Sequence, residues 1–420
     1  MSSLGQVTTG SLKRETDVWI PIDESVSGMM FDIGSLDNAF VGYSLAKNNF
    51  GNGEVNIVRN LQEAESLGIT QYGLLGGVPY YHIKQYYDYL KEDKELYISF
   101  PDINEEGFIE NMMIESDCKV FQIGIWTAQP VLSKTDKDVQ FTPLLSNINT
   151  ELSIISGNEN EPSQYPSGVT AVVCGGIESR ENVSYRNLPN CKSLKYDKIS
   201  LMLGEDSCED TATIHNNISP DAQVGMLGLF MACLTLAYAE ENIGYVGKFN
   251  LNKDDIFTLP VLGVGNTKLQ EINTFRLREL IGKGYIIPVM YEAKEGGVYF
   301  SGDSTMSDKT YNAISINRIS HKFKRVVKKT LTPMINGHVF FDHDMNTVSS
   351  SDITTISNDL NDSIDTYMVN RKGENQLLDY LVSISSYQPN LKDDRLDIEF
   401  TLALLDNQVT LNFIESFNTK

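Results

Sequence analysis

Short apolar segments alternate with helical segments between about residues 28 and 205, and this alternation constrains the fold more than any other feature. Strands are expected in "GMMFDIG", "ELYISF" and "GVTAVVCGG", and helices in "VPYYHIKQYYDYLKED" and "EEGFIENMMIES". Strands that alternate with helices are typical of βαβ units, in which the connecting helices cover a mostly parallel sheet. The sequence therefore predicts an α/β domain over residues 21–250.

The longest apolar run, from Val224 to Ala239, is sixteen residues long and holds two glycines. A helix that crosses a bilayer needs about 20 apolar residues, so this run is too short for that role. We expect a buried core helix that is capped by Ser219 and has Pro220 at its first helical position. No membrane insertion is expected, and the polar N-terminus does not resemble a signal peptide.

Composition shifts near residue 250, which suggests a second domain over residues 251–404. This part reads as a mixture of helices and strands, including a basic helix at 317–331 and a long helix that follows Ser350. The fold class expected for the whole chain is α/β (α+β). Extended arms are expected at residues 1–20 and 405–420.

The closing stretch "LDIEFTLALLDNQVTLNFIESF" alternates apolar and polar residues on either side of "DNQ", which predicts a β-hairpin. An open edge on a terminal strand templates pairing with another chain. We therefore expect strand 396–404 to belong to the subunit's own sheet, and strand 409–414 to be offered to a neighbour. Together with the polar, β-branched "GQVTTGSL" near the N-terminus, this defines the candidate inter-subunit arm residues. They are Gln6, Val7, Thr8, Thr9, Val409, Thr410, Leu411, Asn412 and Phe413.

The net charge is −22, which argues against nucleic acid as the main partner because phosphate binding needs a cationic surface. One helix reverses this sign locally. Its apolar residues recur at helical spacing, so its cations are expected on the outer face: Lys322, Arg325, Lys328 and Lys329. Either this face docks onto a negative partner, or acidic helices of the same chain balance it.

No set of residues with a catalytic pattern emerges. Cys174 follows a strand and could be an exposed nucleophile, but an apolar core thiol is the favoured interpretation. The acidic loop "GEDSCED" at 204–210 is read as solvated rather than as a calcium site. The group His338, Asp342, His343 and Asp344 is read as a solvated turn rather than a metal site. No cofactor and no metal are expected.

For the tyrosine-rich segment and the cysteines as well, a functional site is not the favoured interpretation. The tyrosines between Tyr80 and Tyr89 either form an aromatic binding face or belong to a helix laid on the sheet, and the second interpretation is favoured. The five cysteines lack C-x-x-C spacing and are odd in number, which indicates neither a zinc site nor a disulfide framework. Folding in a reducing cytoplasm is expected.

The order of the segments resembles that of contractile tail sheath proteins of bacteriophages and related injection systems such as R-type bacteriocins. The resemblance covers about 265–417 and is carried by "LRELIGKGYIIPVMYE", "GGVYFSGDSTM", "NRISHKFKRVV", "HVFFDHDMN", the long helix and the closing hairpin. More weakly, earlier segments look like a shortened sheath-like family of prophage elements. The chain departs from the common pattern where "SGDST" replaces "GART"-like text.

The resemblance implies a structural subunit and no enzymatic activity. Such subunits stack as hexameric rings around an inner tail tube, lend terminal arms to neighbours, and contract from a metastable extended state to drive the tube through an envelope. The implied partners are other copies, the tube, and baseplate and tail terminator proteins, with no direct contact to nucleic acid. The implied location is the producing bacterial cytoplasm, then a phage tail or injection particle, and the basic helix is the candidate tube-facing element.

Two alternatives remain open. One is an α/β enzyme, such as a Cys174 hydrolase or a nucleotide-using enzyme. The other is a different self-assembling protein, such as a capsid or surface-layer subunit.

Overall fold

A computed structural model describes residues 26–34, 42–135, 138–156, 165, 168–179, 182–218, 221–264, 267–291, 297–332, 350–369, 377–384, 395–404 and 410–418. The chain divides into two compact units. The larger unit comprises Glu24–Leu152 and Val169–Asn317. The smaller unit comprises Met1–Asp23, Ser153–Gly168 and Arg318–Lys420.

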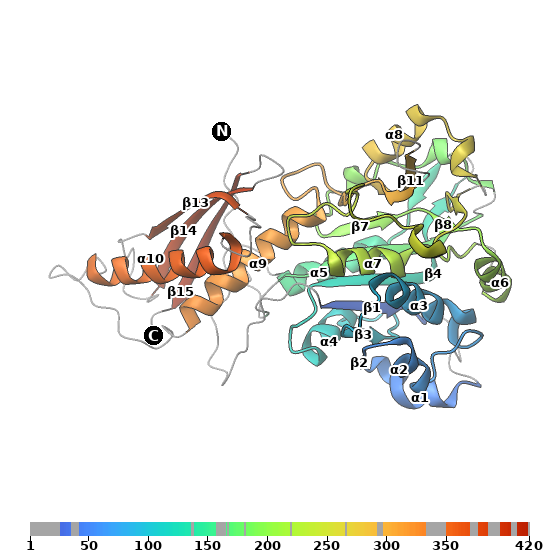
Figure 1. Ribbon diagram of the computed structural model, residues 1–420, viewed down its shortest axis with the longest axis horizontal. Coiled ribbons are helices and arrows are strands. Elements are labelled where there is room, and N and C mark those ends of the chain that lie inside the picture. Colours follow the sequence, from blue (N-terminus) through green and yellow to red (C-terminus); the bar gives the residue numbers. More distant parts are fainter. Residues whose placement is uncertain are drawn as a thin grey trace. The chain divides into compact units, whose positions relative to one another are not determined.

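The larger unit is built on a mostly parallel sheet with the strand order β10-β7-β6-β4-β1-β3-β2 (Figure 1). Its strands are β1 (Ser27–Phe31), β2 (Asn56–Val58), β3 (Leu96–Ser99), β4 (Gln122–Lys134), β6 (Thr170–Ile177), β7 (Ile199–Met202) and β10 (Tyr285–Ile286). Only the edge strand β2, and β5 (Val139–Phe141) beside the end of β4, pair in antiparallel fashion. The predicted α/β class is confirmed, because buried apolar strands alternate with helices along the chain.

Helices cover both faces of this sheet. Gly28 is in register with Ile123, and Met29 with Gly124, so the two glycines lie on opposite faces. A Cβ atom added to Gly28 would lie 3.4 Å from Met112 of α4 (Phe108–Glu115). One added to Gly124 would lie 2.9 Å from Leu227 of α7 (Leu227–Leu236). Two helix layers therefore enclose the central strands.

The predicted core helix is confirmed as α7, whose residues from Leu227 to Thr235 are all buried. It begins at Leu227, so the expected N-terminal cap at Ser219 is wrong. Helix α3 (Val78–Leu90) packs on α7, and Gly228 of α7 lies directly against the backbone of His82. Because Tyr81 and Tyr86 of α3 are buried, the tyrosine-rich segment packs into the core, as the favoured interpretation predicted.

The remaining helices of the larger unit are α1 (Ser44–Phe50), α2 (Leu61–Ser66), α5 (Leu144–Ser156, which ends in the smaller unit), α6 (Glu209–Asn217) and α8 (Thr274–Gly282). Two short pairs complete it: β8 (Glu205–Asp206) with β9 (Pro260–Val261), and β11 (Pro288–Tyr291) with β12 (Gly297–Phe300). The boundary expected near residue 250 falls inside this unit. The physical reason is that β10, which follows residue 250, pairs with β7, which precedes it.

The smaller unit contains a three-stranded antiparallel sheet with β14 (Arg395–Leu404) between β13 (Leu377–Ile384) and β15 (Thr410–Asn418). Helix α10 (Ser350–Ile364) packs on this sheet and continues as a π-helical turn through Val369 (Figure 1). The Tyr380 hydroxyl of β13 donates to Asp365 Oδ1 at 2.8 Å, which fixes the helix to the strand. The long helix expected after Ser350 is therefore confirmed.

Replacing Gly228 with alanine is expected to lower the free energy of unfolding by about 1–3 kcal/mol. A Cβ atom there would lie 2.1 Å from the carbonyl oxygen of His82, so α3 and α7 would have to separate. Urea titration followed by circular dichroism measures the effect. Gly282→Ala is the matched control, because no heavy atom lies within 4 Å of the added Cβ. Equal midpoints for the two variants would contradict the close approach.

Candidate assembly surfaces

The carboxyl end of the parallel sheet is where α/β folds place ligands, at the point where strand order reverses. The reversal here lies between β1 and β4, since β3 flanks β1 on its other side. Asp32 follows β1 at this point and is buried. Its carboxylate accepts hydrogen bonds from Thr127 Oγ1 at 2.6 Å, Gln129 Nε2 at 2.9 Å and Gly34 N at 2.7 Å. These contacts tie the loop after β1 to β4.

Burial is the largest influence on Asp32 and raises the pKa of its carboxyl group, while the hydrogen bonds act in the opposite direction. The hydrogen bonds of the Asp32 side chain are all made within the larger unit.

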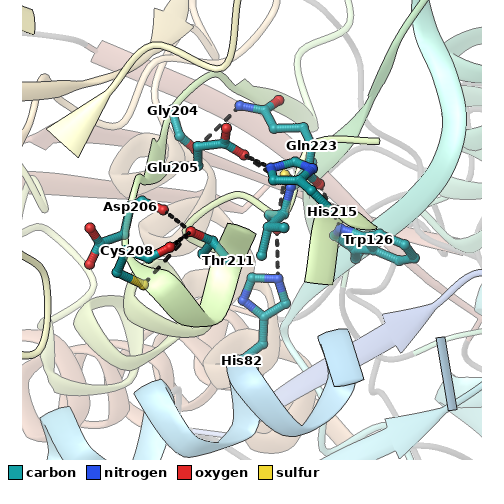
Figure 2. Close-up of polar contacts among 11 residues, drawn as sticks. His82, Trp126, Gly204, Glu205, Asp206, Cys208, Thr211, His215 and Gln223 are labelled. Atoms are coloured by element: carbon teal, nitrogen blue, oxygen red, sulfur yellow. Dashed lines mark hydrogen bonds and ion pairs between the residues drawn. The ribbon is translucent and has the colours of Figure 1, made fainter. Parts of the chain in front are cut away.

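The loop 221–226, which precedes α7, lies against β4 and β6. Polar side chains from several elements hold it (Figure 2). Trp126 Nε1 of β4 donates to the carbonyl oxygen of Gln223 at 2.8 Å. Gln223 Nε2 in turn donates to the carbonyl oxygen of Gly204 at 3.2 Å. These bonds fix the loop against β4 on one side and against the residue before β8 on the other.

Val224 is bonded through both of its peptide groups. Its N–H donates to Glu205 Oε2 at 3.2 Å, and the same oxygen lies 3.1 Å from His215 Nε2 of α6. Its carbonyl oxygen accepts from His82 Nε2 of α3 at 2.8 Å (Figure 2). Two helices and one strand therefore converge on a single residue of the loop.

His82 is neutral in this arrangement. The N–H of Gly228 donates to His82 Nδ1 at 3.2 Å, so that nitrogen is the acceptor and Nε2 carries the hydrogen. Complete burial lowers the pKa of the imidazole to about 4. The ring is a fixed link between α3, the loop and α7.

Cys174 lies beneath the same loop. It is fully buried, and a Cβ atom added to Gly225 would lie 2.1 Å from its Sγ. The core-thiol interpretation is therefore confirmed, and a nucleophilic role for Cys174 is not favoured. None of the five cysteines is in a disulfide.

The acidic loop at 204–210 is only partly solvated, which corrects the sequence-based interpretation. Glu205 and Asp206 are buried because they accept hydrogen bonds from backbone amides. Asp206 accepts from the N–H groups of Thr258 at 2.9 Å and Leu259 at 2.8 Å. Asp210, by contrast, is exposed.

Two expectations concern metals and membranes. In the part of the chain that the structure describes, no group of histidine, cysteine or carboxylate side chains is arranged to hold a metal ion. The candidates His338, Asp342, His343 and Asp344 lie outside that part. Across the same residues, no helix has both the length and the apolar character needed to cross a bilayer.

The basic helix is α9 (Ile314–Leu331), and its predicted apolar stripe is buried. The expectation that its cations share an outer face is wrong for Lys322, Arg325 and Lys328, which are 1%, 1% and 5% exposed. Lys328 Nζ donates to the carbonyl oxygen of Tyr165 at 3.2 Å, and the other two also have partners within the chain. Of the four candidates only Lys329 is exposed, and it lies over the ring of Tyr367 at 5.2 Å.

Burial of these three side chains argues against an outer docking face made of all four cations. Balance by acidic helices of the same chain stays a prediction. A contact with a tube remains an expectation for Lys329.

The predicted C-terminal hairpin is confirmed as β14 and β15. The candidate arm residues Thr410 to Phe413 lie in β15, in register with Ala403 to Phe400 of the same chain. Gln6, Val7, Thr8, Thr9 and Val409 lie outside the described residues. Among the strands that the structure describes, none pairs with the outer edge of β15 or with that of β13.

Strand β13 was not singled out from the sequence, although a signal was present. In "LLDYLVSI" the polar residues Asp379 and Ser383 share one strand face with Leu381, while Tyr380 and Val382 lie on the other. In the structure Leu381 is exposed and Tyr380 contacts α10, so the alternation does separate two faces.

Comparison with solved structures identifies the architecture. The chain matches the sheath of an extracellular contractile injection system, PVC, in its contracted state, over 96% of this chain and 92% of that one. The sequence identity is 10% and the TM-score is 0.54. The fold is that of a contractile-sheath subunit.

A sheath tail protein of Listeria innocua is also similar, over 94% of this chain and 95% of that one, with 9% identity and a TM-score of 0.50. No protein-family profile and no curated protein sequence matches the chain. The sheath fold therefore spans almost the whole chain, although the sequence identity to these structures is only 9–10%.

The stability of the larger unit is expected to depend on His82 between about pH 6.5 and pH 4. In this range the unfolded chain binds a proton that the folded chain does not, because the folded pKa is about 4 against an ordinary value of 6.5. The free energy of unfolding therefore falls as the pH falls, by on the order of 3 kcal/mol in total. Urea titrations of the native chain and of His82→Gln across this range test the effect. Parallel curves for the two proteins would contradict it.

Replacing Asp206 with asparagine is expected to lower the free energy of unfolding by about 1–3 kcal/mol, because an NH₂ group would then face backbone donors. Asp210→Asn removes the same charge from an exposed position nearby and is expected to have little effect. Chemical denaturation of both variants makes the comparison. A similar loss for Asp210→Asn would mean that charge alone, rather than the amide contacts, is responsible.

Proposed function

We propose that the chain is the structural subunit of a contractile tail sheath, which polymerises as stacked hexameric rings around an inner tube and contracts to drive the tube through a target envelope. The observation that carries this proposal is the extent of the match. The fold is shared over more than nine-tenths of this chain and of the sheath proteins compared. A likeness confined to the α/β part would have suited many unrelated activities.

The two edges of the C-terminal sheet with which no described strand pairs support self-assembly. Strand addition uses main-chain hydrogen bonds, so it depends little on side chains and can join copies that later move as rigid bodies. Strand β15 pairs with β14 along one edge, and no described strand pairs with its second edge. Intramolecular pairing and a contact with a neighbouring copy are therefore compatible.

The terminal arms are proposed to join neighbouring copies. The residues involved are Gln6, Val7, Thr8, Thr9 and Val409, together with Thr410 to Phe413 of β15. Because contraction must release free energy, the extended sheath is proposed to be metastable and held by contacts with the tube.

The proposed partners are other copies of the chain, the inner tube, and baseplate and terminator proteins. The chain is proposed to assemble in the cytoplasm of the producing bacterial cell and then to act in a phage tail or an injection particle.

The proposal is tested by deleting residues 405–420. Full-length protein is expected to form hollow cylinders in negative-stain electron microscopy, while the deletion is expected to form none because β15 is missing. Deleting only residues 419–420 retains all of β15 and is the matched control.

Folding of the larger unit can be followed separately. The chain has two tryptophans, so Trp19→Phe leaves buried Trp126 as the sole fluorescent reporter. Blue-shifted emission in the deletion would confirm that this unit has folded. Normal cylinders from the deletion would contradict the arm role, and a full-length protein that forms shells or flat lattices would contradict a sheath.

A further inference from the structure

A second cationic segment lies in the larger unit, between β6 and β7. Residues Ser184 to Lys198 carry four cations and one acid, Asp197, in a chain whose net charge is −22. The cations are Arg186, Lys192, Lys195 and Lys198. This basic segment reverses the sign of the charge around it, as α9 does, but its side chains are differently placed.

The basic segment is held in a fixed conformation. It contains two 3-10 turns, Tyr185–Asn187 and Cys191–Leu194, and a side chain caps each of them. Ser184 Oγ accepts from the N–H of Arg186 at 3.4 Å, and Asn190 Oδ1 accepts from the N–H of Lys192 at 3.1 Å. The capped turns place their cations without further ordering.

Anchors on the inner side pin the segment to the sheet. Leu188 and Cys191 are buried. Lys283 Nζ donates to the carbonyl oxygen of Leu188 at 2.8 Å, and the Tyr285 hydroxyl of β10 donates to that of Pro189 at 2.9 Å. The segment is therefore a supported surface rather than a loose loop.

Among the residues that the structure describes, no carboxylate forms an ion pair with a cation of the basic segment. Arg186 and Lys195 are exposed, and Lys192 and Lys198 are half-buried. Among the described residues no carboxylate lies within 4.0 Å of any of the four, whereas elsewhere pairs such as Lys84 with Asp88, at 2.8 Å, do form. Burial lowers the pKa of Lys198 and Asp197 opposes this shift only in part, so an added carboxylate would stabilise the charged amine.

We propose that the basic segment is the surface through which one copy of the chain binds an acidic surface of a second copy. Charge complementarity supports this proposal. The exposed cations Arg186 and Lys195 lie in a chain that carries 56 acidic residues against 34 basic ones, and no described carboxylate forms an ion pair with them. At physiological salt the screening length is about 8 Å, so local complementarity outweighs the repulsion between the two net charges. The inference rests on the proposed self-assembly.

The contact joins two different patches, and it is therefore heterologous. Contacts of this type repeat from copy to copy without requiring a two-fold axis, and they generate rings or helices. The basic segment would add side-chain attraction to the main-chain pairing at the strand edges. The basic segment belongs to the larger unit, whereas the arms belong to the smaller one.

A triple charge reversal tests the role of the basic segment. The variant carries Arg186→Glu, Lys192→Glu and Lys195→Glu. The concentration of protein at which polymers first pellet in sedimentation is expected to rise about tenfold or more. Circular dichroism, and Trp126 fluorescence measured with the additional change Trp19→Phe, show whether the variant is folded.

The matched control reverses three exposed lysines outside the segment, with Lys47→Glu, Lys253→Glu and Lys309→Glu. The change in net charge is the same, so a general repulsion would affect both variants equally. We expect the control to polymerise close to the native threshold. Equal losses in the two variants, or normal polymerisation of the segment variant, would overturn the inference.

Cross-linking separates this inference from the proposed function. In a mixture of ¹⁴N- and ¹⁵N-labelled chains, carbodiimide joins lysine amines to nearby carboxylates, and mass spectrometry distinguishes links between chains. Links from Lys192 or Lys195 to a carboxylate of a differently labelled chain are expected. Such links in an assembly that is not cylindrical would support the inference and contradict a sheath.

Cylinders without such links would support the sheath and overturn the inference. A third outcome would also overturn the inference. The native protein would bind a short DNA duplex, the segment variant would not, and no links between chains would form, which would assign the surface to nucleic acid.

Discussion

The peptide groups of Val224 hold the carboxyl end of the parallel sheet together. Buried backbone N–H and C=O groups must be hydrogen-bonded, so the loop before α7 can lie against β4 and β6 only where other elements supply partners. Glu205 supplies the acceptor and His82 the donor. With the loop fixed, α7 begins at Leu227 and contacts α3 at Gly228. This contact positions α3 and α7 together on one face of the sheet.

The same arrangement determines how the polar groups of this edge are used. In α/β enzymes this edge presents polar side chains to a ligand. Here Asp32 and Glu205 accept hydrogen bonds from their own chain, and Cys174 lies beneath a loop. The polar groups at this edge therefore hold the larger unit together.

Features set by local periodicity could be predicted from the sequence, and features set by distant contacts could not. The alternating strands, the core helix and the closing hairpin follow from repeats of two or 3.6 residues. The extent of the larger unit depends on β10 pairing with β7 across the expected boundary. Helical spacing located the apolar stripe of α9, but it gives no information about what covers Lys322 and Arg325 on the other side. Asp206 is buried because of donors at Thr258 and Leu259, which are remote in sequence.

The two outer strands of the three-stranded sheet give it two unlike edges. Both β13 and β15 are antiparallel to β14, so the two outer strands run in the same direction, yet they differ in sequence. A copy that joined its neighbours through one outer edge on each side would repeat the same unlike junction along the array. Such an array is polar: its two ends expose different strands, and growth can proceed at different rates from each end.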